Sequence, residues 1–335
     1  MSAVRNFVIT LILSLLIFGL IAYGIVQFAL GAFGLKGEGD ESNGTESDPV
    51  ITGVDDGTAN PDDPAAWDDI KGDSFTVLLI GTDYQPSVYK DYGKSTGVDA
   101  NGFPNDPRTI GADTMILVRI NKETGECVIC AIPTNVKITA DGMQCRLSEL
   151  YAMKGAEAVK RRVMALTGLP VDYYAAISVE NFGKLIDGLG GITFFVANDI
   201  SYVDNTGKTV NIRRGSQKLN GEKAVSMLKY RGYNDGDNTR RTCAAKFLKE
   251  LAKNILVQSN YSDANVLYAK YKDYFDTDFT MDILGKNIDL IFSYSKMNVI
   301  EYTYPGTTTG TGDEEYFNPG ILRATEYFSK YKFNG

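Results

Sequence analysis

The sequence predicts a three-layer α/β/α domain, with a mixed central sheet between two layers of helices, preceded by one transmembrane helix. Three observations predict this class. A long uncharged segment begins the chain, and an acidic segment poor in apolar residues follows it. After residue 74, short apolar runs bounded by Gly, Asp, Asn and Pro alternate with longer segments of helical periodicity. Such alternation is typical of a sheet covered by helices on both faces.

Residues 7–35 contain no charged side chain, and about 20 apolar residues are enough to cross the hydrocarbon core of a bilayer. The apolar region of a cleaved signal peptide is shorter, about 7 to 15 residues, so we expect a retained membrane helix. Arg5 precedes this segment and acidic residues follow it. The positive-inside tendency therefore places residues 1–6 in the cytoplasm and the bulk of the chain on the extracytoplasmic side of the cell membrane.

Residues 36–73 hold twelve acidic residues, two lysines and few apolar side chains, which predicts a disordered linker. Residues 74–335 then form the extracytoplasmic domain, in which acidic and basic residues are nearly equal in number. A domain of balanced charge without a basic tail gives little support to nucleic-acid binding, which needs many uncompensated phosphate contacts. We expect no nucleic-acid partner.

The strands and helices of this domain follow one another in a regular order. Asn238 is a natural N-cap for the last of the expected helices. Strands are expected at 75–83, 113–121, 127–133, 172–178 and 192–197, and helices at 147–169, 180–191, 219–231 and 239–259.

The composition restricts the chemistry, because the chain contains no histidine. This excludes Ser/His/Asp, Cys/His and His-ligated zinc mechanisms. Four cysteines are too few for a disulfide scaffold in a chain of this size. Cys127 and Cys130 fall on one expected strand, where residues three apart point to opposite faces, so we expect buried structural thiols.

Two aspartates flank the first two expected strands. Asp83 ends the first strand and Asp113 opens the second, and the 29 residues of 84–112 between them are longer than an ordinary connection, as in a functional loop or lid. Ligands of such sheets gather beyond the carboxyl ends of strands. Two carboxylates there could hold Mg²⁺ or Mn²⁺, or each could merely cap a turn.

A cationic bend joins the last two expected helices. Its cations are Lys229, Arg231, Arg240 and Arg241. Cations are favoured at the end of the first helix, but the two that begin the second helix oppose its dipole. Either Asp235 or Asp237 neutralises them within the bend, or an external anion such as phosphate does so.

The ordered motifs "LLIGTD", "ADTMILVRIN", "AIP", "GLPVDYYAAIS", "LIDGLGGITFFV" and "GSQKLNGEKAV", followed by the cationic bend and a helix, resemble the LytR-CpsA-Psr family. The resemblance covers about residues 75–257, and residues 260–332 are compatible but less distinctive. It implies an extracytoplasmic domain on one membrane helix, which transfers a phosphate-linked glycopolymer from an undecaprenyl pyrophosphate carrier to peptidoglycan, normally with Mg²⁺.

The resemblance also assigns roles to single residues. Asp83 matches the aspartate of the family's "GVD" and Asp113 that of "RSDT", which implies two metal ligands for Mg²⁺ or Mn²⁺. Arg231 matches the second arginine of "YxRxR", and Arg240 matches the arginine three residues after a loop aspartate, here Asp237. The implied catalytic residues are Asp83, Asp113, Arg231 and Arg240. The implied pyrophosphate-binding residues are Lys229, Arg231, Asp237, Arg240 and Arg241.

The chain departs from the family where several arginines are usual. Such losses matter because a single stabilising arginine can change the rate of phosphoryl transfer by about 10³ to 10⁵. Arg108, Arg119 or Arg146 could fill a vacancy from elsewhere in the sequence. The substituted positions are Gly111, Thr134 with Asn135, Lys229, and Cys243 with Ala244.

Two functions therefore stay open. The chain is a glycopolymer transferase, or it is a catalytically weak relative that binds a polyprenyl pyrophosphate or acts as a scaffold in the cell envelope. An isoprenoid tail would need an apolar groove. Candidates are "YYAAIS" at 173–178, "ITFFV" at 192–196 and the helices that follow, although core packing explains these residues equally well.

Overall fold

The computed structural model describes residues 74–83, 111–140, 143–204, 207–235, 237–256, 271–279, 283, 293–310 and 315–331. The predicted transmembrane helix, the acidic linker and residues 84–110 of the long connection lie outside this part of the chain. Within it, no helix combines the length and the apolar character that a membrane crossing requires. The expected domain boundaries therefore stay predictions.

Six strands form the central mixed sheet, in the order β11-β6-β1-β2-β3-β12. β1 pairs antiparallel with β2 and parallel with β6, while β3 pairs antiparallel with β2 and parallel with β12. β11 joins β6 antiparallel. The strands are β1 (Ser74–Thr82), β2 (Thr114–Asn121), β3 (Glu126–Ile132), β6 (Tyr173–Ser178), β11 (Phe275–Thr277) and β12 (Asn298–Thr303).

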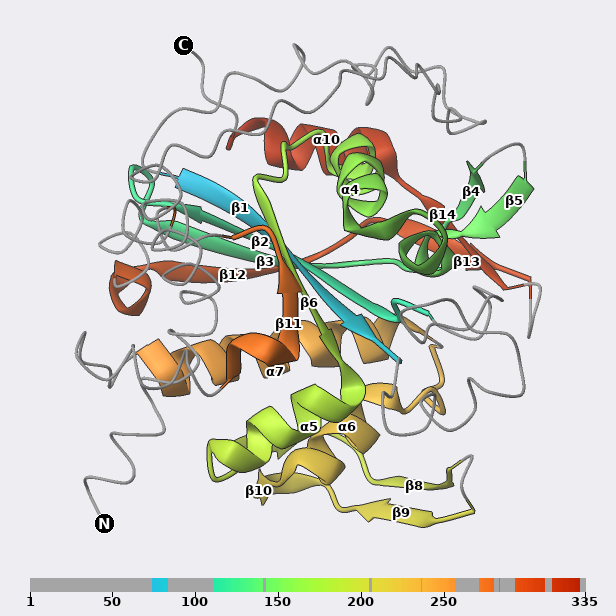
Figure 1. Ribbon diagram of the computed structural model, residues 1–335, viewed down its shortest axis with the longest axis vertical. Helices are drawn as coiled ribbons and strands as arrows, with labels where there is room; N and C mark the ends of the chain where they lie inside the picture. Colours follow the sequence, from blue (N-terminus) through green and yellow to red (C-terminus); the bar gives the residue numbers. More distant parts are fainter. Residues whose placement is uncertain are drawn as a thin grey trace, which may run out of the picture.

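Helices cover both faces of this sheet (Figure 1). α4 (Leu147–Thr167) and α10 (Ile321–Ser329) lie on one face. α5 (Val179–Gly188), α6 (Gly221–Lys229) and α7 (Asp237–Leu256) lie on the other. Alternate side chains of β1, β2 and β3 enter two separate hydrophobic cores. The predicted mixed α/β fold with a central mixed sheet is confirmed.

The two cysteines of β3 illustrate this division. Cys127 belongs to the core beneath α7, whereas Cys130 belongs to the core beneath α4 and α10. Both thiols are free and buried, as expected, and burial raises the pKa of Cys127 to about 12. Neither thiol can therefore share a metal ion with the other.

Local sequence signals set the helix boundaries. Ser178 caps α5 by accepting a hydrogen bond from the backbone N–H of Asn181 at 3.2 Å, and Asn220 caps α6 by accepting from Lys223 at 2.9 Å. α4 ends at Gly168, whose φ of 66° favours glycine. These caps and this glycine therefore set where α5 and α6 begin and where α4 ends.

Four two-stranded pairs complete the described part. β4 and β5 lie, with β13 and β14, toward the side of the molecule where the carboxyl end of β1 is found (Figure 1). The pairs are β4 (Lys137–Ala140) with β5 (Met143–Arg146), β7 (Ile192–Val196) with β10 (Gly215–Leu219), β8 (Ile200–Val203) with β9 (Thr209–Ile212), and β13 (Gly306–Thr309) with β14 (Tyr316–Pro319).

Candidate functional site

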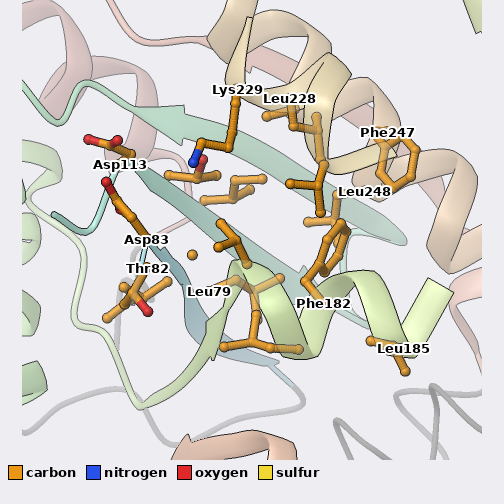
Figure 2. A pocket seen from close by; sticks show the side chains of 18 of the residues that line it. Leu79, Thr82, Asp83, Asp113, Phe182, Leu185, Leu228, Lys229, Phe247 and Leu248 are labelled. Atoms are coloured by element: carbon orange, nitrogen blue, oxygen red, sulfur yellow. The ribbon is translucent and has the colours of Figure 1, made fainter. Parts of the chain in front are cut away.

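A cavity of about 200 Å³ lies between the central sheet and helices α5, α6 and α7. Most of its wall is apolar (Figure 2). The apolar lining includes Leu79, Ile177, Phe182, Leu185, Leu228 and Leu248. A wall built from three helices and strands β1, β2, β6 and β11 suits an extended hydrocarbon group.

Charged side chains occupy one end of this cavity. Asp83 and Asp113 lie close together there, and Lys229 reaches toward them from α6 (Figure 2). Arg231 and Arg240 also line the cavity. The cavity therefore joins an apolar body to a polar end that carries two carboxylates and three cations.

Strand pairing explains why the two aspartates meet. Asp83 directly follows β1 and Asp113 directly precedes β2. Since β1 and β2 are antiparallel neighbours with Gly81 opposite Thr114, these two chain positions fall at the same sheet edge. The backbone N–H of Asp83 also donates to the carbonyl of Gly111 at 3.0 Å, which holds these two chain positions together at this edge.

The cationic bend reaches the same point from the other side. Arg231, just beyond the end of α6, places Nη2 at 3.3 Å from Oδ1 of Asp113. Arg240, in the first turn of α7, donates from Nη2 to the backbone carbonyl of Asp113 at 2.9 Å and from Nη1 to Oγ1 of Thr114 at 3.4 Å. The structure therefore brings the acidic pair and the bend together around one small volume.

Asp237 neutralises the arginines within the bend. Its Oδ1 lies 2.5 Å from Nε of Arg240 and 3.7 Å from Nη1 of Arg231, and its Oδ2 lies 3.5 Å from Nε of Arg241. The salt-bridged alternative therefore describes the bend as it stands, while two of the three arginines still face the cavity.

Arg241 and Asp237 differ from the other predicted ligands in their position. Both side chains are buried, and neither lines the cavity. The guanidinium of Arg241 lies over the ring of Phe317 at 4.6 Å. Their predicted contact with pyrophosphate stays a prediction.

The expected N-cap of α7 is wrong. Asn238 lies inside the helix, which begins at Asp237. Asp235, two residues before that start, accepts a hydrogen bond from the backbone N–H of Thr239 at 3.3 Å. An aspartate therefore satisfies a donor of the first turn and complements the helix dipole there.

The environment of Asp83 is unfavourable for a lone carboxylate. Burial, and next the charge of Asp113, raise the pKa of Asp83 to about 6, against the opposing effects of Lys229 and Arg231. Its Oδ1 is buried and has no hydrogen-bond partner within the described residues. A buried, unsatisfied carboxylate oxygen beside a second carboxylate fits a hard divalent cation.

The donor set also limits which metal could bind. Among the described residues, no group of three or more acidic, cysteine or histidine side chains could hold a metal ion. Mg²⁺ is usually bound by one or two carboxylates, with water and substrate phosphates as its remaining ligands. Asp83 and Asp113 match that pattern.

Apart from Lys229, none of the substituted positions supplies a cation to the site. A Cβ added to Gly111 would lie 3.1 Å from Oδ1 of Asp113, so a side chain at that position would begin next to the acidic pair. Thr134 is buried, and its hydroxyl donates to the carbonyl of Asp113 at 3.5 Å. Cys243 is a free thiol on α7 that does not line the cavity.

The arginines suggested as replacements lie elsewhere. Arg119 is buried within the sheet, where it donates to Thr76 and Ser74 at 2.9 Å each. Arg146 lies over the ring of Tyr316 at 5.2 Å and does not line the cavity. Arg108 is outside the described residues. The cations of the described lining are Lys229, Arg231 and Arg240.

Of the two strands named as candidates for an apolar groove, one lines the cavity and the other does not. Ala175 and Ile177 of "YYAAIS" line the cavity, as do residues of α5, α6 and α7. No residue of "ITFFV" does so. That segment is β7, whose Phe194 packs against Phe247 at 5.2 Å between ring centroids, behind the cavity wall. Its apolar residues are explained by core packing.

Fold and site together define an α/β protein with an apolar pocket that ends in opposed carboxylate and cationic groups. The chain belongs to the LytR_cpsA_psr family, whose family model matches residues 50–332.

Curated relatives match parts of the chain. The polyisoprenyl-teichoic acid–peptidoglycan teichoic acid transferase TagU of Bacillus subtilis is 28% identical over 163 residues, which is 48% of this chain and 45% of TagU. TagU of Enterococcus faecalis is 25% identical over 216 residues, which is 63% of this chain and 64% of that protein. The chain thus matches less than two thirds of the length of these relatives.

Solved structures share the fold. Protein gbs0355 of Streptococcus agalactiae superposes with a TM-score of 0.62 at 22% identity, covering 77% of this chain and 87% of that one. TagV of Bacillus subtilis gives 0.61 at 18% identity, with 78% and 98% covered. A structure of TagT bound to LI-WTA gives 0.56 at 20% identity, with 78% and 92% covered.

Proposed function

We propose that this protein transfers a glycopolymer from an undecaprenyl pyrophosphate carrier to peptidoglycan during cell wall assembly. The observation that carries this proposal is that one cavity has both an apolar body and a charged end. An isoprenoid chain needs apolar surface, and a pyrophosphate needs cations. The names of the TagU relatives, which describe polyisoprenyl-teichoic acid as donor and peptidoglycan as acceptor, support it.

In this proposal the cationic bend binds the pyrophosphate. Arg231 and Arg240 offer planar guanidinium groups, which suit the forked hydrogen bonds of phosphate, and Lys229 adds a point charge. Arg240 is held by Asp237 and by the carbonyl of Asp113, so it needs little ordering when the ligand binds. The prenyl tail would lie along α5, α6 and α7.

Asp83 and Asp113 would hold Mg²⁺, or alternatively Mn²⁺. The ion would offset negative charge on the phosphate oxygens when bound. The unsatisfied oxygen and raised pKa of Asp83 support this assignment, because a nearby divalent cation favours the charged carboxylate. The remaining ligands would be water and phosphate oxygens.

The transfer step is a phosphoryl displacement. A muramic acid hydroxyl attacks the phosphorus that bears the glycan, and the bond from that phosphorus to the bridging oxygen breaks. Undecaprenyl phosphate leaves, and the hydroxyl proton passes to a carboxylate of the acidic pair. Arg231 and Arg240 stabilise the charge that spreads over the phosphate oxygens.

The proposal places this reaction at the outer side of the cell membrane. The predicted helix at 7–35 would anchor the chain, with residues 1–6 in the cytoplasm. The acidic linker at 36–73 would let the domain reach both a lipid carrier in the bilayer and the wall beyond it.

A second candidate function is a catalytically weak relative that binds the polyprenyl pyrophosphate or acts as an envelope scaffold. The observation that favours it is the small number of cations at the polar end. Gly111, Thr134 and Cys243 contribute none, and Arg119 and Arg146 have other contacts. Binding tolerates such losses better than transfer does, because transfer depends on stabilising the developing charge.

One experiment separates the two functions. The full-length chain in lipid nanodiscs would be incubated with Mg²⁺, peptidoglycan and a synthetic undecaprenyl pyrophosphate carrying a radiolabelled glycan. We expect label in the peptidoglycan with the natural chain and with Asp273→Ala, an exposed control on a 3₁₀ turn, but not with Asp113→Ala. Donor binding without transfer would support the scaffold function, and absence of donor binding would refute both.

A further inference from the structure

We propose that Asp237 is a positioning residue of the polar end. It does not contact the ligand, but fixes Arg240 and Arg241 and keeps the exposed Arg231 nearby, where it can turn toward a phosphate. This inference rests on the proposed function. It gives Asp237 a different role from the pyrophosphate contact that the family resemblance implies.

The geometry makes Asp237 the centre of the cationic bend. Three guanidinium groups approach its two carboxylate oxygens, Arg240 at 2.5 Å, Arg241 at 3.5 Å and Arg231 at 3.7 Å. The side chain of Asp237 is 6% exposed and does not line the cavity. The buried carboxylate of Asp237 repels a bound pyrophosphate. It can assist binding only by positioning the arginines that lie between the two.

The side chains of the three arginines differ in their exposure to solvent. The side chains of Arg240 and Arg241 are 3% and 7% exposed, whereas that of Arg231 is 54% exposed. Arg231 is also shared between Asp237 and the Oδ1 of Asp113 at 3.3 Å. An exposed guanidinium shared between two carboxylates, at 3.3 and 3.7 Å, forms weak ion pairs and can turn toward a phosphate at small cost.

Fixed guanidinium groups would repel one another without a shared counter-ion. Arg240 and Arg241 are consecutive residues in the first turn of α7, where the helix dipole disfavours cations. The carboxylate of Asp237 offsets both effects, and the contact of Arg241 with Phe317 orients the pair. Arg240 thereby keeps its hydrogen bond to the carbonyl of Asp113 at 2.9 Å.

The alternative to positioning predicts the opposite sign. If Asp237 were merely a nearby negative charge, Asp237→Asn would make the polar end more positive and tighten pyrophosphate binding. If Asp237 positions the arginines, the same change releases them and weakens binding. The sign of a single measurement therefore separates the two.

The test uses the full-length chain in nanodiscs, with farnesyl pyrophosphate and farnesol as probes in isothermal titration calorimetry. We expect Asp237→Asn to weaken farnesyl pyrophosphate binding about 10- to 100-fold, the range for losing hydrogen bonds to charged groups. Farnesol binding should change by less than about 2-fold, because the tail has no charge to position. Asp235→Asn, in the same bend but with its hydrogen bonds to Asn238 and Thr239 and none to an arginine among the described residues, is the matched control and should bind both probes like the natural chain.

A double-mutant cycle shows whether Asp237 acts through Arg231. In an Arg231→Gln background, Asp237→Asn should weaken farnesyl pyrophosphate binding by clearly less than in the natural background. Independent, multiplicative effects of the two substitutions would overturn the coupling between them.

A second variant covers the case in which the buried arginines destabilise the fold once Asp237 is neutral. Asp237→Asn combined with Arg241→Met removes one buried anion and one buried cation, and keeps an apolar contact with Phe317. We expect natural circular dichroism and farnesol binding, with farnesyl pyrophosphate still bound about 10-fold more weakly. Natural affinity in this variant would overturn the inference. If the natural chain itself binds both probes equally, the proposed function fails as well.

Discussion

Neutralising Asp83 should stabilise the metal-free protein while it abolishes function. Burial and the charge of Asp113 raise the pKa of Asp83 from 3.8 to about 6, so the folded chain binds this proton more tightly than the unfolded chain. An acid with a raised pKa lowers stability at neutral pH, and the penalty disappears as pH falls through 6 toward the unfolded value. Asp83→Asn removes the penalty at all pH values.

The size of the effect follows from the shift. About two pKa units at 1.36 kcal/mol each give an upper limit of about 3 kcal/mol above pH 7. Water at the open edge of the site reduces this to about 1 to 2 kcal/mol. For a domain of this size, we expect Asp83→Asn to raise the melting temperature by roughly 2 to 8 °C.

Thermal unfolding in EDTA, followed by circular dichroism, measures this difference. At pH 7.5 the Asn variant should melt higher, and at pH 5 the gap should shrink to about half, because the natural side chain is then largely protonated in the folded state. Mg²⁺ should stabilise the natural chain but not the variant. Asp273→Asn serves as an exposed control. An Asn variant that melts at or below the natural temperature at pH 7.5 would refute the argument that the fold disfavours this charge.

Other substitutions test separate parts of the site. Leu228→Trp should fill part of the apolar cavity and weaken farnesol binding about 10-fold or more in calorimetry, because an overfilled site must exclude the chain. Arg240→Gln should cost about 3 to 5 kcal/mol in urea unfolding, since it leaves Asp237 under-compensated, whereas the exposed Arg231→Gln should cost less than about 1 kcal/mol. Equal costs would contradict the division between fixed and exposed arginines. Phe317→Ala should cost about 3 to 5 kcal/mol in the same assay, and loss of less than about 1 kcal/mol would show that β14 does not support the bend.

Periodicity and turn residues were sufficient to predict the centre of the fold. The strands expected at 75–83 and 127–133 occur at 74–82 and 126–132, and the helix expected at 147–169 occurs at 147–167. These segments have continuous apolar runs or strong helical spacing because the sheet is buried on both faces. The sequence did not show the interruption of α4 at Gly155, whose φ is 75°, because an isolated glycine does not reveal its own backbone angle.

The edges of the sheet were harder to predict. β11 and β12 come from the less distinctive residues after 260, and β12 is only partly buried, so it lacks a strong apolar run. The pairs β4 with β5 and β13 with β14 are four-residue strands rich in polar side chains. Their positions depend on contacts between segments far apart in the chain, which local patterns do not encode.

The site divides in the same way. The approach of Asp83 to Asp113 follows from two adjacent strands, so strand order nearly predicts it. The sequence indicates Asp237 as only one of two possible neutralising residues, because charge spacing shows that a carboxylate is needed but not which one supplies it. The sequence does not distinguish "ITFFV", which lies behind the cavity wall, from α5, α6 and α7, which line the cavity, because all of these segments contain apolar residues.

The structure of the protein with bound farnesyl pyrophosphate tests the central claim most directly. The account predicts the diphosphate at the polar end, with its oxygens within hydrogen-bonding reach of Arg231 and Arg240, and the farnesyl chain between α5, α6 and α7. A diphosphate bound away from Asp83 and Asp113, or a farnesyl chain outside this cavity, would contradict it.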